Sequence, residues 1–428
     1  MARRTTFRIC FGIVMAFMAT AHAARADDWP QWRGPGRDGK SAEKNLLRSW
    51  PEGGPPLEWK AEGLGRGYAS VAVVGDRIYT MGLRDNRPHL IALDARGGAV
   101  VWATPVGGEG EQAPNCTPTI DGDRVYGLTF QGTLACCSAR DGKVEWTKDF
   151  AKDFGGRMMS GWGYAESPLI DGDRLVCTPG SPNAMLAALD KATGNPIWTT
   201  PVADNVGEKG QPGAAYASIV ISRGGGVKQY VQLVGRGVIG VDAETGKLLW
   251  VYDKIANGTA NCPTPVVSGN FVFASSGYGD GGSVLLELGR AGRGQVAARE
   301  VFYYTANQVQ NHHGGMILID EYLYMGHGQN NGLPLCLDLR TGQDAWRPGR
   351  GVGSGSAAVA YADGHLYFRY ENGEMALIEA TPKEYRVKGQ FKLAVNLDRS
   401  WPHPAIADGR LYIRDQDVLL RYDVRGGK

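Results

Sequence analysis

Short runs of apolar and β-branched residues recur along this chain, separated by turns that contain glycine and aspartate. In each copy a Gly-Asp turn precedes one expected strand, a second turn precedes a strand that ends at Asp, and a Gly turn precedes a strand that carries Trp. A spacing of eight residues joins Asp94 to Trp102, Asp190 to Trp198, Asp242 to Trp250, Asp338 to Trp346 and, with Ser in place of Asp, Ser138 to Trp146. The pattern predicts repeated hairpins in which Gly accepts a positive φ and Trp packs on the neighbouring copy.

The Gly-Asp turn that opens each copy fixes the number of copies. Gly75-Asp76, Gly122-Asp123 and Gly172-Asp173 are clear examples, and weaker ones continue as far as Asp408-Gly409. With the glycine-rich stretch 224–227, which fills the remaining gap, they mark eight units that begin roughly 44 to 53 residues apart, a period typical of a β-propeller. The fifth and seventh units have no Trp at the expected place and have longer hairpins.

The last unit contains Asp423 and a Gly turn but no returning strand with Trp. A matching strand lies near the N-terminus, around Trp59. If this strand joins the last unit, the ring closes and two open sheet edges disappear. The expected fold is therefore all-β: a single eight-bladed propeller of four-stranded antiparallel blades over residues 57–428, with residues 27–56 packed on it as an N-terminal extension.

Residues 1–26 have the order of a secretory signal peptide. Basic residues precede an apolar stretch from Ile9 to Ala19, and Ala-x-Ala triplets end at Ala23 and Ala26. The apolar stretch is shorter than the roughly 20 residues that a membrane span requires. We therefore expect cleavage after Ala23 or Ala26 and export of a monomeric chain to the periplasm or the exterior.

Composition excludes several classes of protein. The chain has 62 Gly among 428 residues, and much of this glycine falls in the repeated turns. A hydrophobic fraction of 43% provides ample core and argues against disorder. The 46 Lys and Arg nearly balance the 44 Asp and Glu and are mixed with them along the chain. Nucleic-acid binding is not expected, because it requires a basic patch or stripe.

The copies resemble the tryptophan-docking repeat of quinoprotein-like propellers, most clearly in the segment 188–198. This superfamily includes pyrroloquinoline-quinone (PQQ) alcohol dehydrogenases and the BamB-type outer-membrane assembly propeller. The segments 28–35 (DWPQWRGP) and 161–168 (GWGYAESP) are similar to a secreted bacterial branch labelled PQQ-binding-like β-propellers. The resemblance covers nearly the whole chain after the signal peptide and implies the fold, whereas the repeat does not specify a function.

Residues just before each innermost strand of a propeller surround the mouth of its channel, where ligands usually bind. Taken singly, each is explained as a turn residue or as packing at a blade edge. Together they predict a polar and aromatic rim that binds a small molecule or a peptide end. The candidates are Tyr68, Asn115, Cys116, Tyr164, Glu166, Tyr216, Asn261, Cys262, His312, His313, Arg399, Trp401 and His403.

Two adjacent pairs of residues need separate consideration. Cys136-Cys137 resembles the adjacent-cysteine disulfide of PQQ alcohol dehydrogenases, but side chains alternate along a strand. Two separately packed thiols are therefore the favoured interpretation. By the same alternation, His312 and His313 are expected to point to opposite faces unless their loop is irregular. No metal site is predicted, since no Cys/His group has zinc spacing.

Two functions remain open. The first is a non-catalytic scaffold that holds a protein or a small ligand at the propeller mouth. The alternative is a PQQ-dependent oxidoreductase of an alcohol or sugar, with PQQ and Ca²⁺ at the mouth. The resemblance implies an Asp base, calcium ligands, cationic contacts and a Trp platform for such an enzyme. Glu166, Asn261, Arg399 and Trp401 are single candidates for these roles, but no catalytic Asp motif is evident.

Overall fold

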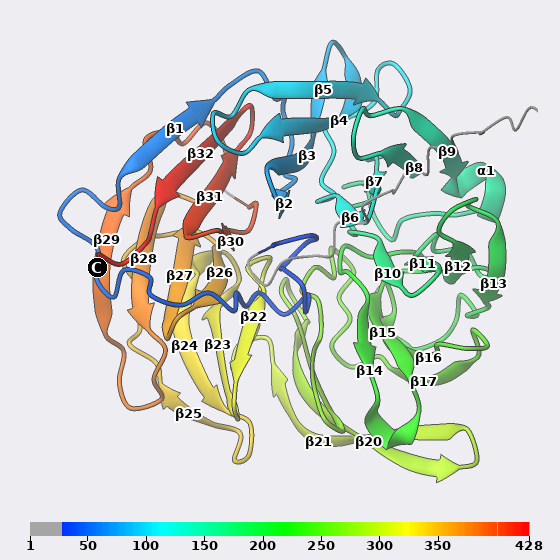
Figure 1. The fold of residues 1–428 in the computed structure, drawn as a ribbon. Coiled ribbons are helices and arrows are strands. Elements are labelled where there is room, and N and C mark those ends of the chain that lie inside the picture. Colours follow the sequence, from blue (N-terminus) through cyan, green and yellow to red (C-terminus); the bar gives the residue numbers. More distant parts are fainter. Residues whose placement is uncertain (1–27, 400, 428) are drawn as a thin grey trace, which may run out of the picture.

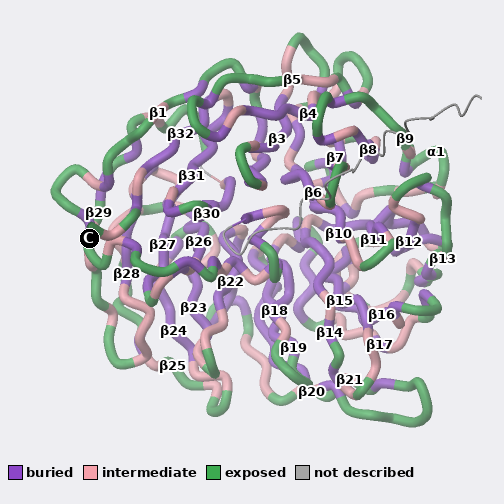
Figure 2. The backbone as a smooth tube through the Cα atoms, in the orientation of Figure 1, coloured by how far each residue is buried: buried purple, intermediate pink, exposed green. Residues whose placement is uncertain are grey.

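The computed structural model describes residues 28–399 and 401–427, which form a closed ring of eight four-stranded antiparallel sheets (Figure 1). The expected eight-bladed propeller is confirmed. The predicted signal peptide lies outside the described residues. Each blade begins beside the central channel and ends at the perimeter, so burial is greatest along the inner strands (Figure 2).

Blades 1 to 4 follow one another along the chain. Blade 1 consists of β2 (Ala72–Val74), β3 (Arg77–Arg84), β4 (Arg87–Asp94) and β5 (Val100–Pro105). Blade 2 consists of β6 (Thr119–Asp121), β7 (Arg124–Leu128), β8 (Thr133–Ser138) and β9 (Val144–Asp149), followed by the short helix α1 (Phe150–Phe154). Blade 3 consists of β10 (Leu169–Asp171), β11 (Arg174–Cys177), β12 (Leu186–Asp190) and β13 (Pro196–Thr200). Blade 4 consists of β14 (Val220–Ser222), the 3-10 turn η1 (Gly224–Gly226), β15 (Gln229–Val234), β16 (Gly237–Asp242) and β17 (Leu248–Tyr252).

Blades 5 to 8 complete the ring. Blade 5 consists of β18 (Val266–Ser268), β19 (Phe271–Ser276), β20 (Gly282–Gly292) and β21 (Gln295–Thr305). Blade 6 consists of β22 (Met316–Ile319), β23 (Tyr322–His327), the 3-10 turn η2 (Gln329–Asn331), β24 (Leu333–Asp338) and β25 (Gln343–Trp346). Blade 7 consists of β26 (Ala357–Ala362), β27 (His365–Tyr370), β28 (Glu374–Glu379) and β29 (Val387–Lys392). Blade 8 consists of β30 (Ala405–Ala407), β31 (Arg410–Asp415), β32 (Val418–Asp423) and β1 (Leu57–Ala61).

The ring closes as the sequence predicted, because β1 pairs antiparallel with β32 as the outer strand of blade 8. In this pairing Trp59 lies opposite Arg421 and Ala61 opposite Leu419. Glu58 on β1 also accepts ion pairs from Arg410 and Arg421, each at 3.2 Å. Closure thus joins the first described strand to the last one by backbone and side-chain contacts.

Four of the repeated tryptophans dock on the glycine turn of the next blade, whereas Trp250 lies over Gly240 of its own blade and donates to Gln229 there, because blade 5 has no matching glycine turn. The indole of Trp146 in blade 2 lies over Gly194 of blade 3, and its Nε1 donates to the carbonyl oxygen of Lys191 at 3.2 Å. In the same turn Asp190 Oδ1 accepts the backbone N–H of Thr193 at 2.8 Å. Trp102 over Gly142, Trp198 over Gly246 and Trp59 over Gly98 repeat this arrangement. The Asp therefore stabilises the turn, and the indole packs against the Gly because that residue has no Cβ.

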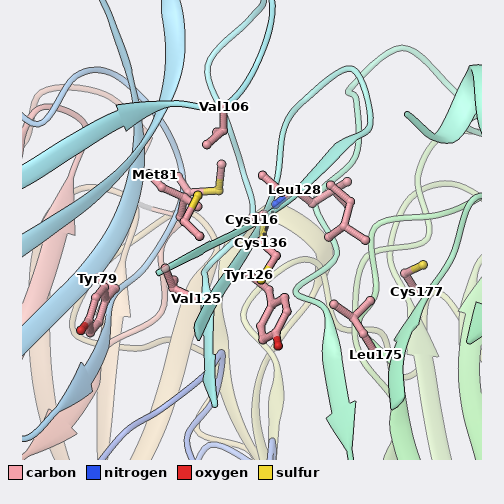
Figure 3. Packing of buried hydrophobic residues seen from close by; sticks show 14 of the residues in the cluster. Tyr79, Met81, Val106, Cys116, Val125, Tyr126, Leu128, Cys136, Leu175 and Cys177 are labelled. Carbon is pink, nitrogen blue, oxygen red and sulfur yellow. Dashed lines mark hydrogen bonds between the residues drawn. The ribbon is translucent and has the colours of Figure 1, made fainter. Parts of the chain in front are cut away.

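Hydrophobic clusters fill the space between neighbouring blades. The largest includes Tyr126, Cys136 and Leu175 and spans blades 1 to 3 (Figure 3). Cys136 and Cys137 are both free and buried, so they are two packed thiols, as the strand pattern favoured. Burial raises the pKa of each thiol to about 12.

The N-terminal segment, residues 28–56, crosses the centre of the ring before it reaches β1 (Figure 1). Trp29 pairs with Val73 on β2 through two backbone hydrogen bonds of 2.8 Å. Arg37 is buried in the channel and donates to the carbonyl oxygens of Ile219 at 2.9 Å, Ser167 at 2.7 Å and Pro168 at 3.1 Å. One guanidinium therefore ties the segment to blades 3 and 4.

The docking contact predicts the effect of adding a methyl group at Gly194. A Cβ there would lie 2.8 Å from the Trp146 ring, whereas a Cβ at Gly172 would meet nothing within 4 Å, although both residues have positive φ. We expect Gly194→Ala to lower the free energy of unfolding by about 1–3 kcal/mol more than the control Gly172→Ala, because only Gly194→Ala adds a clash to the backbone strain. Urea denaturation measures the difference, and equal losses in the two variants would contradict the docking account.

The buried Arg37 contacts predict a second effect on stability. Arg37→Met should lower the free energy of unfolding by at least about 2 kcal/mol, because it leaves buried carbonyl oxygens without donors. Arg48→Met is the matched control, since Arg48 is exposed on the same segment. Denaturant unfolding compares the two variants, and a loss at Arg37 no larger than that at Arg48 would show that the Arg37 hydrogen bonds do not stabilise the ring.

Candidate functional site

The candidate site is a cavity at one end of the channel, which we call the mouth. Because the strands of each blade are antiparallel, the segments entering the first strands and the turns between the second and third strands lie at this same end. They enclose a cavity of about 380 Å³. This volume falls in the range typical of small-molecule sites.

The structure brings many of the sequence candidates together and excludes others. Those that line the mouth cavity are Tyr68, Asn115, Tyr216, Cys262, His313, Arg399, Trp401 and His403. Those that do not line it are Cys116, Tyr164, Glu166, Asn261 and His312. Trp32, Phe130, Trp162 and Tyr278 also line it and were not among the candidates.

The candidates outside the cavity are held by contacts within the protein. Tyr164 packs on Phe150 and donates through its hydroxyl to the carbonyl oxygen of Pro179 at 2.8 Å. The buried Glu166 carboxyl accepts hydrogen bonds from Thr178 N at 2.7 Å and from Thr178 Oγ1 at 2.9 Å. These side chains therefore have structural partners.

The amide of Asn261 is also engaged inside the protein. Its Nδ2 donates to the carbonyl oxygen of Gly235 at 3.0 Å, and its Oδ1 accepts from Asn257 Nδ2 at 2.9 Å. Asn261 thus connects two segments behind the mouth and does not offer its amide to a ligand.

One wall of the cavity is a stack of rings and a cation. The Tyr68 and Trp401 rings lie 4.7 Å apart, and Trp401 lies 4.8 Å from the His313 ring. The guanidinium of Arg399 lies over Trp401, 5.4 Å from the ring centroid. Two anchors set this wall: the Tyr68 hydroxyl donates to Asp398 Oδ2 at 3.0 Å, and the Trp401 indole N–H donates to Glu371.

The two adjacent histidines do not point to opposite faces, because their loop is irregular, which is the exception that the sequence-based expectation allowed. They precede β22 in an irregular loop, and their ring centroids lie only 3.5 Å apart. Tyr278 joins the pair, with its hydroxyl 3.1 Å from His313 Nε2. Burial lowers the pKa of His312 to about 4 and that of His313 well below its usual value. Both imidazoles are therefore neutral at pH 7.

The N-terminal segment supplies the floor of the cavity. Trp32 packs against His403 with ring centroids 5.5 Å apart, and the Arg33 guanidinium lies 5.3 Å from the Trp32 ring centroid. His403 Nε2 donates to the carbonyl oxygen of His313 at 3.0 Å, and burial lowers the pKa of His403 to about 3. The segment that fills the channel thus also closes the cavity from below.

Charge in the cavity comes from Arg399. Among the described residues that line it, no other side chain is ionised at neutral pH, and none is a carboxylate. No described carboxylate forms an ion pair with Arg399 within 4 Å. The lining therefore presents one positive charge among neutral polar and aromatic groups, while the carboxylates of Asp398 and Glu371 next to it are hydrogen-bonded to Tyr68 and Trp401.

A calcium-bound quinone does not fit this lining. Ca²⁺ prefers carboxylate and carbonyl oxygens, and the two candidates for this role, Glu166 and Asn261, are engaged behind the mouth. No group of three or more His, Cys, Asp or Glu residues suitable for a metal ion is found between residues 28 and 427, Ser400 excepted.

A family model described as outer membrane protein assembly factor BamB matches residues 43–129 and 116–348. These ranges cover more than half of the chain. The chain belongs to this family. The family implied by the repeat is thereby confirmed. The described part of the chain includes no helix with the length and apolar character of a membrane span.

Individual relatives match less of the chain or share less of its sequence. The BamB assembly factor of Burkholderia pseudomallei (strain K96243) is 30% identical over 116 residues, which cover 26% of this chain and 27% of that protein. A quinohemoprotein alcohol dehydrogenase from Pseudomonas putida HK5 has a TM-score of 0.62 at 14% identity, covering 94% of this chain and 81% of that one. A second, from Comamonas testosteroni, has a TM-score of 0.52 at 13% identity, covering 95% and 82%. At these identities the two structures show a shared fold.

The buried imidazoles predict that stability falls in mild acid. The pKa of His312 is lower in the folded chain than in the unfolded one, so below about pH 6.5 the unfolded chain takes up the proton first. At pH 5 this lowers the free energy of unfolding by about 2 kcal/mol relative to pH 7. We expect His312→Gln to reduce the pH dependence of the free energy of unfolding, measured by urea unfolding at pH 5, 6 and 7. His89→Gln is the control, since His89 does not line the cavity. The prediction would be contradicted if the free energy of unfolding of His312→Gln depended on pH as steeply as that of the wild type.

Proposed function

We propose that this chain is an exported, non-catalytic propeller that binds a small ligand in the mouth cavity. The observation that carries the proposal is the shape of this cavity: an aromatic cup, open at one end and closed below by Trp32 and His403. Sites of this size use aromatic walls for affinity and a few polar groups for specificity. Ligand enters and leaves through the mouth.

The family and the sequence support this role in the cell envelope. The family description names an outer membrane protein assembly factor, and the predicted signal peptide provides the route of export. A protein partner that inserts a side chain or chain end would use the same cup. PQQ-dependent oxidation is the weaker hypothesis, since the carboxyl and amide groups suited to calcium do not face the cavity.

The test is a thermal-shift screen of the purified chain against small ligands. The panel contains neutral sugars, acidic sugars, aromatic carboxylates, short peptides, and PQQ with CaCl₂. We expect at least one sugar, carboxylate or peptide to raise the Tm by about 3 °C at a concentration 100-fold above its Kd, because binding stabilises the folded state.

A matched pair of variants locates the binding. Trp162 lines the cavity and is 54% exposed, so Trp162→Ala removes a contact surface at little cost to stability. Ile197 on β13 is 48% exposed and does not line the cavity, so Ile197→Ala is the control. The shift should shrink in Trp162→Ala and persist in Ile197→Ala. The proposal fails if no ligand in the panel raises the Tm, or if PQQ with CaCl₂ supports dye reduction by alcohols.

A further inference from the structure

We propose that the ligand of the mouth cavity is an acidic sugar, a hexuronate at the end of a chain or alone, with its carboxylate on Arg399 and its ring against the aromatic walls. This inference rests on the proposed function and specifies its ligand class. Three independent features of the lining support it: a single cation, exposed ring faces, and buried nitrogens without partners.

The charge of the lining selects an anion. Arg399 is exposed at the mouth, and its guanidinium packs on Trp401 with no carboxylate of the described residues bound to it. A guanidinium binds a carboxylate through two parallel N–H···O bonds, and packing on an indole leaves its edge available for them. No acidic side chain described in the lining offers a site for a cationic ligand.

The aromatic side chains select a ring with apolar faces. Trp162 lines the cavity with 54% of its surface exposed, and Trp401 and Tyr68 form an aromatic wall of the same cavity. The C–H faces of a pyranose ring pack on such indole and phenol faces, which removes apolar surface from water on both sides. Because Trp162 is largely exposed in the free protein, a bound sugar ring would bury indole surface that is otherwise in contact with water.

The polar groups select hydroxyls rather than a plain aromatic acid. The Nδ1 atoms of His313 and His403 are buried and have no hydrogen-bond partner in the described part of the chain. His403 donates through Nε2, so its Nδ1 is an acceptor without a donor beside the cavity, and a shift of the ring on ligand binding would bring it to a sugar hydroxyl. At the rim, Asn115 uses its Nδ2 on the carbonyl oxygen of Trp162 at 3.1 Å, which leaves its Oδ1 for a second hydroxyl.

The closed floor determines how a longer chain would bind. Trp32 and His403 block passage through the channel, and about 380 Å³ is available above them. A polysaccharide therefore cannot thread through the ring. The cup accommodates the terminal acidic residue, and the remainder of the chain leaves past Trp162.

Isothermal titration calorimetry tests the inference with glucuronate, galacturonate and digalacturonate against glucose, galactose and benzoate. We expect at least one uronate to bind at least 10-fold more tightly than the neutral sugars and benzoate. Arg399→Gln should weaken that binding about 10- to 100-fold, because a hydrogen-bonded ion pair is lost. Arg399→Lys should retain part of the affinity, since it keeps the charge but not the paired geometry.

The control is Arg140→Gln. Arg140 is exposed in the turn between β8 and β9, which lies at the opposite end of the ring from the mouth. The Arg140→Gln protein should therefore bind uronates with the affinity of the wild type. Equal binding of glucose and glucuronate, unchanged affinity in Arg399→Gln, or tight binding of benzoate or a peptide alone would overturn the acidic-sugar inference but leave the proposed function intact. Absence of any ligand in the wider panel would overturn both.

Discussion

The structure depends on how the channel at the centre of the ring is filled. Eight blades leave an axis lined by backbone carbonyl groups, and buried carbonyl oxygens need donors. Arg37 supplies donors to three of them at once, to Ser167, Pro168 and Ile219, and Arg33 is buried close by. The N-terminal segment is thereby fixed across the axis, and the channel becomes a cup with one opening.

The properties of the candidate site follow from this closure. Trp32 is positioned as the floor because its neighbour Arg33 is held in the channel, where it donates to the carbonyl oxygen of Met316 on β22. Burial above this floor keeps His313 and His403 neutral, so Arg399 at the opening supplies the charge. Binding by a single cation among aromatic rings does not require a catalytic group.

The fold could be predicted from the sequence because its determinants are local and repeated. The Asp, Gly and Trp of each copy define one turn and one docking contact, and the strand around Trp59 supplied the missing piece of blade 8. The site was predictable only in part. Neighbouring residues in an entering segment can face different ways. Tyr164 and Glu166 form hydrogen bonds within the protein, whereas Trp162 of the same segment lines the cavity. Nothing in the repeat indicated that Trp32, far away in sequence, would form the floor.

Hydrogen exchange measured by mass spectrometry, with and without saturating galacturonate, tests most directly the claim that ligand binds in a cup closed by the N-terminal segment. We expect added protection in the segments entering β2, β6, β14, β22 and β30 and around Trp32, with none in the turns at the opposite end such as the one between β8 and β9. Protection confined to that opposite end or to the outer strands would contradict it.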